Sequence, residues 1–578
     1  MFVWVLSSNL TKGLEYRTYL AIIFLSSILL TITGYYGSLI LIESSTLYLV
    51  FLVLVASSII IWLAIDNVFS DILVICMLMS LFTSIQLIMP TTFVGWDING
   101  EWRIFNVVFN NQKWYPDQPQ HLYNTVLSIT ILPLIFQEIS GLSSFYFMKY
   151  FSSVIYALAI YLVYKLTDNI FPKLYRAIGL ILLLSQIQTY SEMTSISRQE
   201  IALFILAVAF LFLIKGKCVG SSAFLLASAA LMHYSSFFMI IVAILVGIIS
   251  IRFFNFENVR GLALSFLVAC IAGFLWYSYI VWTGVLSKSA LIIYDILFEI
   301  EHYLTGKPIS PPGISVLMRP FNEPNVFASI LHYISKFLGA LFFVLLLFGF
   351  ILALKLETKK RTIKSRYVIF TLGFLVIFLI SLSSNYVASA LNLSRFISTS
   401  LIFLAPYIGY STFGLVGRVA KKFLFFKKVI YLITFLSVLT FFLIQSGVLW
   451  EISGSNTGTF PLRSFWCIRY GDAKQAYEAS IFLGTAADNA ISAFIIDYFP
   501  KHSKLDFDIG SYIRYFSVYS NYIYQVQRQD SYIFLSIANI RSGLWIKNGE
   551  ALELNKLLTL ENETLIFSSS NALILRRR

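Results

Sequence analysis

Two acidic side chains, Asp97 and Glu101, stand four residues apart in the segment Gly95–Trp102. If this segment is helical, that spacing places both carboxylates on one face. A poorly solvated boundary would raise the pKa of at least one of these carboxyl groups toward the range that suits a general base, which takes a proton from a hydroxyl group. The structural alternative is that Asp97 caps a surface helix, Glu101 favours its positive first turn, and the neighbouring tryptophans only anchor it at a membrane interface.

Three further polar patches carry groups that could bind an anion. Within 188–200, Glu192 adds a third acid, and the guanidinium of Arg198 can hold a phosphate or carboxylate in a fork. His233 could hydrogen-bond a phosphate or orient a carboxylate. Arg395 would be costly at membrane depth without an anionic partner, for which a lipid headgroup is one candidate. The ordinary alternatives are a solvated Arg–Glu pair, a histidine satisfied at a helix end, and an arginine that extends to the membrane surface.

The composition places these groups in a membrane protein. Of the 578 residues, 58% are hydrophobic and 12% are charged, and the mean hydropathy is +0.79. Soluble domains average about 45–50% apolar and about 25% charged residues. The four cysteines form no C-x-x-C pattern, which argues against structural zinc and redox chemistry.

Apolar runs of about 20 residues predict about thirteen transmembrane helices. Lys and Arg gather in alternate connections, most densely in 355–366 and 418–428, so we expect these connections and the N-terminus to be cytoplasmic in a multi-pass plasma-membrane protein. The net charge of +13 is then explained by anionic lipid headgroups and not by nucleic acid. The predicted spans are 19–42, 46–64, 71–90, 147–165, 175–190, 200–214, 219–233, 235–251, 261–284, 337–354, 367–383, 396–412 and 429–449.

Two domains follow from this topology. Residues 1–449 form an all-α transmembrane domain with long outer loops at 91–146 and 285–336, and Tyr123–Ile139 is predicted to lie as a helix along the outer membrane surface. Residues 450–578 form an extracytoplasmic α/β domain, because their apolar runs are only of strand length. Its expected elements are a helix at 472–483 and strands at 490–497, 531–538 and 564–567.

All four polar patches fall on the outer side of this topology. Acids, arginines and a histidine at the outer mouth of a helical bundle suit a reaction between a lipid phosphate and an acceptor. The sequence has no phosphate-binding G-x-x-x-x-G-K-[ST] loop, dinucleotide fingerprint or serine-nucleophile elbow. We therefore do not expect ATP bound by this chain to supply the energy.

The order of these features resembles the GT-C superfamily of membrane glycosyltransferases, which use polyprenyl-phosphate-linked sugars. More closely, 97–101, 122–133, 192 with 197–202, and 233–235 resemble a largely archaeal, GT-C-like family of polytopic membrane proteins of unknown function. The similarity covers about residues 90–250 well and the C-terminal domain only loosely. The chain has Asn99 where histidine is common in that family, and it lacks the W-W-D-Y-G-type signature of oligosaccharyltransferases, which argues against en bloc glycan transfer to asparagine.

The resemblance implies a GT-C-like glycosyltransferase that moves a sugar from a polyprenyl-phosphate donor to a glycan, lipid or protein acceptor on the outer face. Asp97 would be the general base, and Glu101 or Glu192 would position the acceptor. The donor phosphate would be bound by Arg198, His233, Tyr234 and Arg395. No cofactor is required, although a divalent cation such as Mg²⁺ or Mn²⁺ is compatible with this chemistry.

Two other classes of protein remain open at this stage. A polysaccharide polymerase or ligase that uses lipid-diphosphate glycans would also carry outer arginines, but it would not need the early acidic pair. A lipid-glycan flippase or transporter would place ionisable groups near mid-membrane, where the predicted spans have few.

Overall fold

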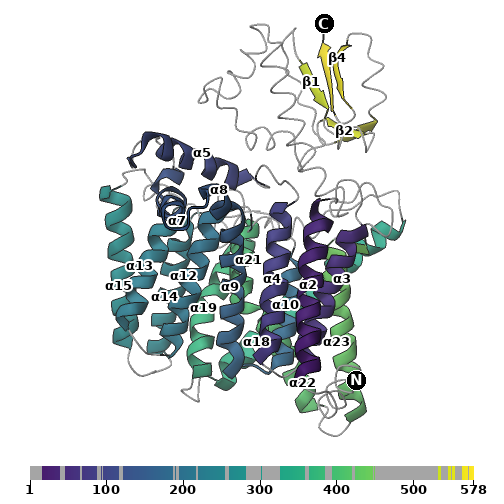
Figure 1. Ribbon diagram of the computed structural model, residues 1–578. Coiled ribbons are helices and arrows are strands. Elements are labelled where there is room, and N and C mark those ends of the chain that lie inside the picture. Colours follow the sequence, from purple (N-terminus) through teal and green to yellow (C-terminus); the bar gives the residue numbers. More distant parts are fainter. Residues whose placement is uncertain are drawn as a thin grey trace.

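The computed structural model is a bundle of roughly parallel helices with shorter helices lying across one end (Figure 1). Strands near the C-terminus lie beyond that same end. The structure describes residues 16–39, 46–64, 68–87, 93, 96–115, 122–186, 189, 194, 196–215, 219–253, 259–280, 294, 298, 301, 326–357, 363–383, 393–419, 424–446, 448–449, 532–535, 544–547, 550–553, 563–569 and 572–577.

Seven helical segments in the described part of the chain are long and apolar enough to cross a membrane. This confirms a largely helical, membrane-type fold. They lie in α2 (Tyr16–Leu39), α3 (Thr46–Ala64), the continuous run of α8 (Ser144–Tyr146), η2 (Phe147–Phe151) and α9 (Ser152–Leu166), α12 (Ser197–Lys215), α14 (Tyr234–Phe253), α15 (Val259–Leu275) with η5 (Trp276–Ile280), and α18 (Val326–Glu357).

The remaining apolar helices complete the bundle, and each predicted span overlaps a helix of the structure. A helix needs roughly 20 residues to cross the hydrocarbon layer, so overlap alone does not make each of them a span. These helices are α4 (Val68–Leu87), α10 (Lys173–Ser185), α13 (Val219–Met232), α19 (Ile363–Ser383), α21 (Leu393–Leu404), α22 (Pro406–Val419) and α23 (Leu424–Gln445).

The predicted span 396–412 is not one continuous helix, because the helix is interrupted at Ala405 between α21 and α22. Pro406 has no N–H to continue the hydrogen-bond ladder, and its ring crowds the carbonyl four residues earlier. At Gly179 of α10 an added Cβ would lie 2.8 Å from the backbone nitrogen of Pro406. Only glycine therefore lets α10 approach this break directly.

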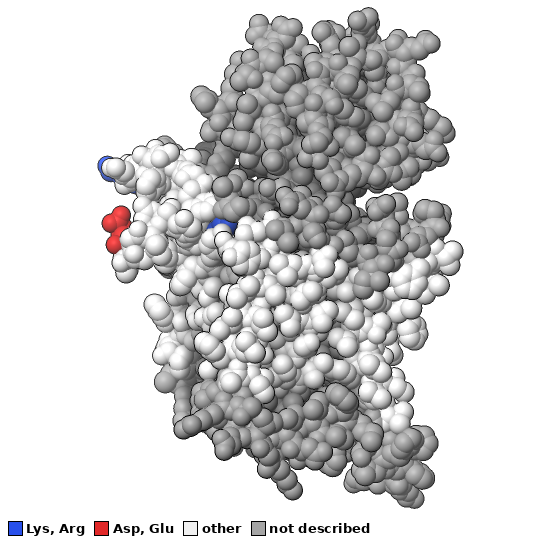
Figure 2. Space-filling view, turned by 45° about the vertical axis from the view of Figure 1, so that its right-hand side comes forward, with Lys and Arg blue, Asp and Glu red and all other residues white. Residues whose placement is uncertain are grey.

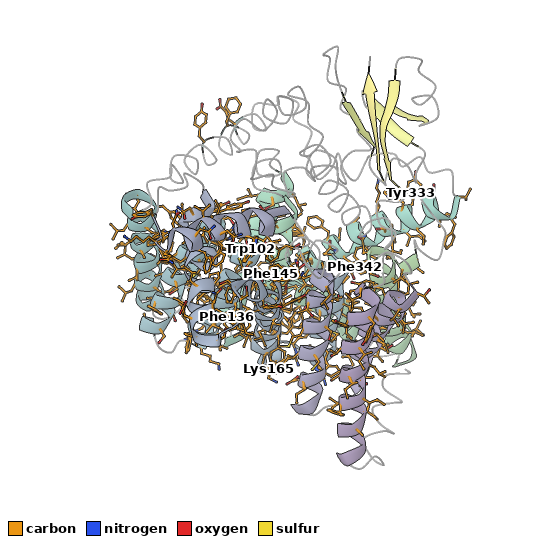
Figure 3. All side chains as sticks on the ribbon, turned by 45° about the horizontal axis from the view of Figure 1, so that its top comes forward. Trp102, Phe136, Phe145, Lys165, Tyr333 and Phe342 are labelled. Atoms are coloured by element: carbon orange, nitrogen blue, oxygen red, sulfur yellow. The ribbon has the colours of Figure 1, made fainter. Side chains whose placement is uncertain are left out.

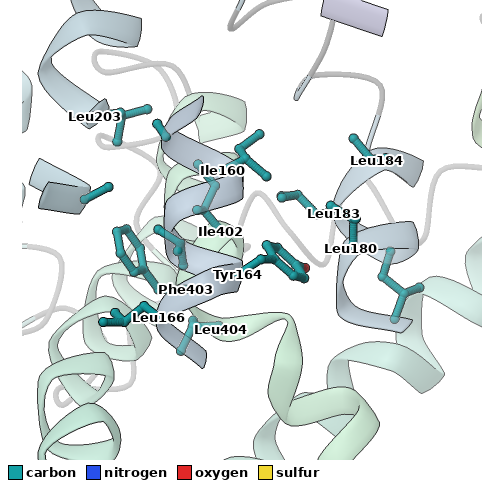
Figure 4. Close-up of a cluster of buried hydrophobic side chains, with 14 of the residues drawn as sticks. Ile160, Tyr164, Leu166, Leu180, Leu183, Leu184, Leu203, Ile402, Phe403 and Leu404 are labelled. Carbon is teal, nitrogen blue, oxygen red and sulfur yellow. The ribbon is translucent and has the colours of Figure 1, made fainter. Parts of the chain in front are cut away.

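The core around this contact is apolar and closely packed. Figure 4 shows side chains of α9, α10, α12 and α21 interleaved in it. This packing fixes the position of α21, which carries Arg395 at its first turn. The labelled residues are Ile160, Tyr164, Leu166, Leu180, Leu183, Leu184, Leu203, Ile402, Phe403 and Leu404.

The outer wall of the bundle is also apolar. Large side chains such as Phe24 of α2, Phe274 of α15 and Phe337 of α18 are more than half exposed. On the face shown in Figure 2, charged residues of the described part appear only near the end that carries α5 (Trp96–Asn111). A wide uncharged wall of this kind fits the hydrocarbon layer of a membrane.

The helices across the end of the bundle are α5, η1 (Leu122–Thr125), α6 (Leu127–Thr130) and α7 (Leu132–Ser140). The predicted helix over Tyr123–Ile139 is thus three short pieces. The second predicted outer loop, 285–336, lies mostly outside the described residues, and α18 already begins at Val326 within that range.

Five described strands form two small antiparallel sheets near the C-terminus. β1 (Tyr532–Leu535), β5 (Ala572–Arg577) and β4 (Glu563–Ser569) pair in the order β1-β5-β4, and β2 (Leu544–Lys547) pairs with β3 (Glu550–Glu553). The predicted strands at 531–538 and 564–567 coincide with β1 and β4. The predicted helix at 472–483 and strand at 490–497 lie outside the described residues.

Candidate active site

The acidic pair lies on a helix, as its spacing predicts. Asp97 is in the first turn of α5, Glu101 follows one turn later, and both side chains are buried. The opposite flank of α5 is held by an aromatic cluster, in which the Trp102 ring lies 5.5 Å from that of Phe93 and 5.7 Å from that of Phe145. Figure 3 shows Trp102 and Phe145 close together at this end of the bundle.

Two arginines from distant parts of the chain meet this acidic pair. Arg395 donates to Oδ2 of Asp97, and Arg198 donates to Oε1 of Glu101. Arg198 also lies 3.5 Å from Oδ1 of Asp97 through Nη2. Arg198 is in the first turn of α12, where the helix dipole disfavours a cation, so the two carboxylates compensate for both burial and the dipole.

Tyr123 completes the contacts of Asp97 from η1. Its hydroxyl donates to Oδ1 of Asp97, and its ring centroid lies 4.0 Å from the guanidinium carbon of Arg198, a cation–π contact. A Cβ added at Gly100 would lie 3.1 Å from the Tyr123 ring. The glycine in the acidic motif therefore gives this ring room to pack against α5.

Hydrogen bonds from two indole rings hold η1 in place. Trp114 and Trp276 stack with their ring centroids 5.7 Å apart. Their Nε1 atoms donate to the carbonyls of Asn124 and Thr125, at 3.0 and 2.9 Å. These bonds anchor η1 to the residues after α5 and to η5, so the position of Tyr123 does not depend on its own contacts alone.

His233 and Tyr234 lie beside this network, at the junction of α13 and α14. Nδ1 of His233 lies 2.9 Å from the hydroxyl of Ser236. Burial lowers the pKa of His233 well below its ordinary value, and the charges of Arg198 and Arg395 lower it further. The imidazole is therefore neutral and could serve an anion only as an N–H donor.

The two carboxyl groups have opposite acidities. Burial would raise the pKa of Asp97, but Arg395, Arg198 and the Tyr123 hydrogen bond together outweigh it and hold the pKa at about 2. Burial raises the pKa of Glu101 to about 7 despite the opposing effect of Arg198. The difference has a visible cause, because Oε2 of Glu101 is buried with no hydrogen-bond partner.

The site thus combines two arginine cations with two different acids. Asp97 is ionised, and Glu101 has a pKa of about 7. Arg395 is the accessible cation, with 23% of its side chain exposed against 1% for Arg198. A phosphate could approach Arg395 from solvent and compete with Asp97 for it, because both anions offer the guanidinium the same oxygen geometry.

The two acids of α5 already have cationic partners. Asp97 and Glu101 both face guanidiniums, and no group of three or more His, Cys, Asp or Glu residues among the described positions could hold a metal ion.

The structure brings six of the seven predicted site residues together, and the seventh, Glu192, lies outside the described residues. Asp97, Glu101, Arg198 and Arg395 are in direct contact, with His233 and Tyr234 beside them. Tyr123, which donates to Asp97, and the buried Glu200 of α12 were not among the predicted site residues. Their signal in the sequence was only their position, since Tyr123 begins the predicted surface helix 123–139 and Glu200 ends the polar patch 188–200.

No family model matches the chain, and no curated protein matches it at a significant level.

Proposed function

We propose that this chain is a multi-spanning membrane glycosyltransferase of the GT-C type. It transfers a sugar from a polyprenyl-phosphate donor to a glycan, lipid or protein acceptor at the outer face of the plasma membrane. The observation that carries this proposal is the convergence of two guanidiniums on the acidic pair of α5, at one end of an apolar bundle. Buried arginines at a membrane boundary suit the phosphate of a lipid-linked donor.

In this mechanism the donor phosphate replaces Asp97 as the partner of Arg395. Loss of Arg395 as a partner raises the pKa of Asp97 from its low value, and Oδ2 becomes free to take the proton of an acceptor hydroxyl. The acceptor oxygen forms its bond to the sugar carbon from the side opposite the phosphate, and the carbon–oxygen bond to the phosphate breaks with its electron pair going to the phosphate. The product is inverted at that carbon, and the phosphate charge is stabilised by Arg395 and Arg198.

The other residues of the site hold this geometry. Tyr123 orients the Asp97 carboxylate through Oδ1, which leaves Oδ2 for the acceptor. Glu101 keeps Arg198 in place, and Glu101 or Glu192 positions the acceptor. Neutral His233, with Tyr234 beside it, offers a hydrogen bond to the phosphate without adding charge.

Arg395→Ala tests phosphate binding most directly, because this cation is the more exposed of the two. We expect it to weaken the binding of a synthetic polyprenyl phosphate by tenfold or more, since a hydrogen bond to a charged group contributes about 1.5–3 kcal/mol. Binding is measured by titration of the purified protein. The matched control is Arg366→Ala, whose guanidinium bonds the Ile214 carbonyl at 3.4 Å. Equal affinities in wild type and Arg395→Ala would contradict a donor site at Arg395.

The direction of the helices supports an outer position for the site. α9, α12 and α14 all run away from the α5 end and carry Lys165, Lys215 and Arg252 in their last turns. Figure 3 shows Lys165 far from Trp102. Because Lys and Arg favour the cytoplasmic side, the opposite end would face outward. About thirteen spans and a cytoplasmic N-terminus would place residues 450–578 on the outer side as well.

Reporter fusions test this topology. A reporter that is active only in the cytoplasm should give signal when fused after Lys359 and none when fused after Gly471, because an odd number of spans separates the N-terminus from residue 450. Reporter activity is measured in intact cells, with fusion abundance checked by immunoblot. Signal after Gly471 would remove the outer C-terminal domain from the proposal.

A further inference from the structure

Glu200 is a buried acid that the proposed transfer reaction does not use. It lies in the first turn of α12, within a candidate membrane span, and its side chain is fully buried. Neither carboxylate oxygen has a hydrogen-bond partner. An ionisable residue inside a membrane span is expensive and is usually kept for a function.

Hydroxyl groups of the neighbouring helix α9 surround this carboxylate. The hydroxyls of Ser152 and Ser153 lie close to the carboxylate, and Tyr156 is close enough to feel its charge. The Ser152 hydroxyl also donates to the Met148 carbonyl at 2.7 Å. The hydroxyls of Ser153 and Tyr156 are buried without a hydrogen-bond partner. Four oxygen atoms, two from Glu200 and one each from Ser153 and Tyr156, are thus left unsatisfied in one place, whereas buried polar atoms are normally bonded.

The other carboxylates of the network already have counter-ions. Asp97 pairs with Arg395 and Glu101 with Arg198, whereas no ion pair joins Glu200 to a cation among the described residues. Lys149, on the turn before Ser152, is directed elsewhere, with its Nζ 5.0 Å from the ring centroid of Phe145. Among the described acids of this network, Glu200 is therefore the one without a positive partner.

We propose that Glu200, Ser152, Ser153 and Tyr156 form a binding site for a monovalent cation of the Na⁺ type. Carboxylate and hydroxyl oxygens are ligands that suit hard cations. A single positive charge neutralises the single carboxylate, whereas a divalent ion would leave an excess charge in an apolar span. A proton would also neutralise the carboxylate, but it would leave lone pairs of the hydroxyl oxygens unused, whereas a cation can contact all four oxygens.

The site lies next to the proposed active site. Glu101 is close enough to Glu200 for their charges to interact. The occupant would therefore supply a positive charge behind the acidic pair and also tie α12 to α9. Cation binding at this site is separate from the proposed sugar transfer and does not depend on that transfer.

The test measures the thermal unfolding midpoint of the purified full-length protein against Na⁺ concentration, with choline replacing Na⁺ at constant ionic strength and pH. A ligand that binds only the folded state raises the midpoint as its concentration rises above the dissociation constant. We expect such a rise in wild type. Glu200→Gln should abolish it, and Ser153→Ala should raise the apparent dissociation constant for Na⁺ by about tenfold or more.

Ser185→Ala is the matched control, because Ser185 is an equally buried helical serine whose hydroxyl bonds the Ile181 carbonyl at 2.7 Å. It should keep the wild-type response to Na⁺. If Glu200→Gln does not fold, Ser153→Ala still tests the cation site, since it removes an oxygen that makes no hydrogen bond.

Equal midpoints in Na⁺ and choline would overturn the proposal. A midpoint that follows pH but not Na⁺ would show a bound proton instead, and a response to Mg²⁺ alone would show a divalent site. These unfolding measurements contain no donor lipid. A missing response to Na⁺ is therefore distinct from a missing activity in the transfer assay.

Discussion

Asp97→Asn should lower the rate of sugar transfer by on the order of 10²–10⁴-fold, the usual contribution of a general base. Asparagine keeps the shape of the side chain and can still accept from Tyr123, but it cannot take a proton. Donor binding should not weaken, because the phosphate is bound by the arginines and Asp97 no longer competes with it for Arg395. Transfer is measured with a synthetic polyprenyl-phosphate sugar and the purified variant, and donor affinity is measured in parallel.

The control for this experiment is Asp71→Asn, which neutralises an acid paired with Lys165 at 2.7 Å, away from the site. It should leave transfer unchanged. If Asp97 only stabilises the start of α5, asparagine would replace it well, because Asn caps helices about as well as Asp. Near-wild-type transfer by Asp97→Asn would therefore end the case for Asp97 as the base.

Arg198→Gln should destabilise the folded protein by about 3–5 kcal/mol, the usual result of removing one partner of a buried ion pair. The guanidinium is 1% exposed and serves both carboxylates, so its loss leaves Glu101 buried without a counter-ion. The free energy of unfolding is measured by denaturant titration in mixed micelles. Donor binding should weaken as well, because the phosphate contacts Arg198 in the ground state.

The double variant Arg198→Gln, Glu101→Gln separates charge from packing. It removes both members of the pair and keeps their size, so most of the lost stability should return. Donor binding should not return with it, because no cation has been restored. A double variant as unstable as Arg198→Gln would show that the arginine acts through packing, and recovered donor binding would remove Arg198 from the phosphate site.

Local features of the site could be predicted because they depend on spacing within one helix. A separation of four residues places Asp97 and Glu101 on one face of any α-helix, and α5 has this form. The high cost of a charge at membrane depth likewise predicted a partner for Arg395. The candidate named for that partner was a lipid headgroup, whereas the structure supplies Asp97.

Contacts between distant segments could not be predicted from periodicity. Nothing in the run from Tyr123 to Ile139 shows that one hydroxyl will turn toward Asp97, because that depends on the anchoring of η1 by Trp114 and Trp276. The break at Pro406 was visible in the sequence. A hydropathy window averages over a single proline, however, and so merged α21 and α22 into one span.

The pairing of Asp97 with Arg395 joins residues 298 positions apart, which has a consequence for how the protein is made. Chains enter the membrane from the N-terminus, so α5 is in place long before α21 has been synthesised. Until then, among the described contacts of the site, Asp97 and Glu101 share the single cation Arg198. Insertion of α21 completes the charge balance, so a chain that stops before residue 393 exposes an unfinished polar site to the proteases and chaperones that survey membrane proteins.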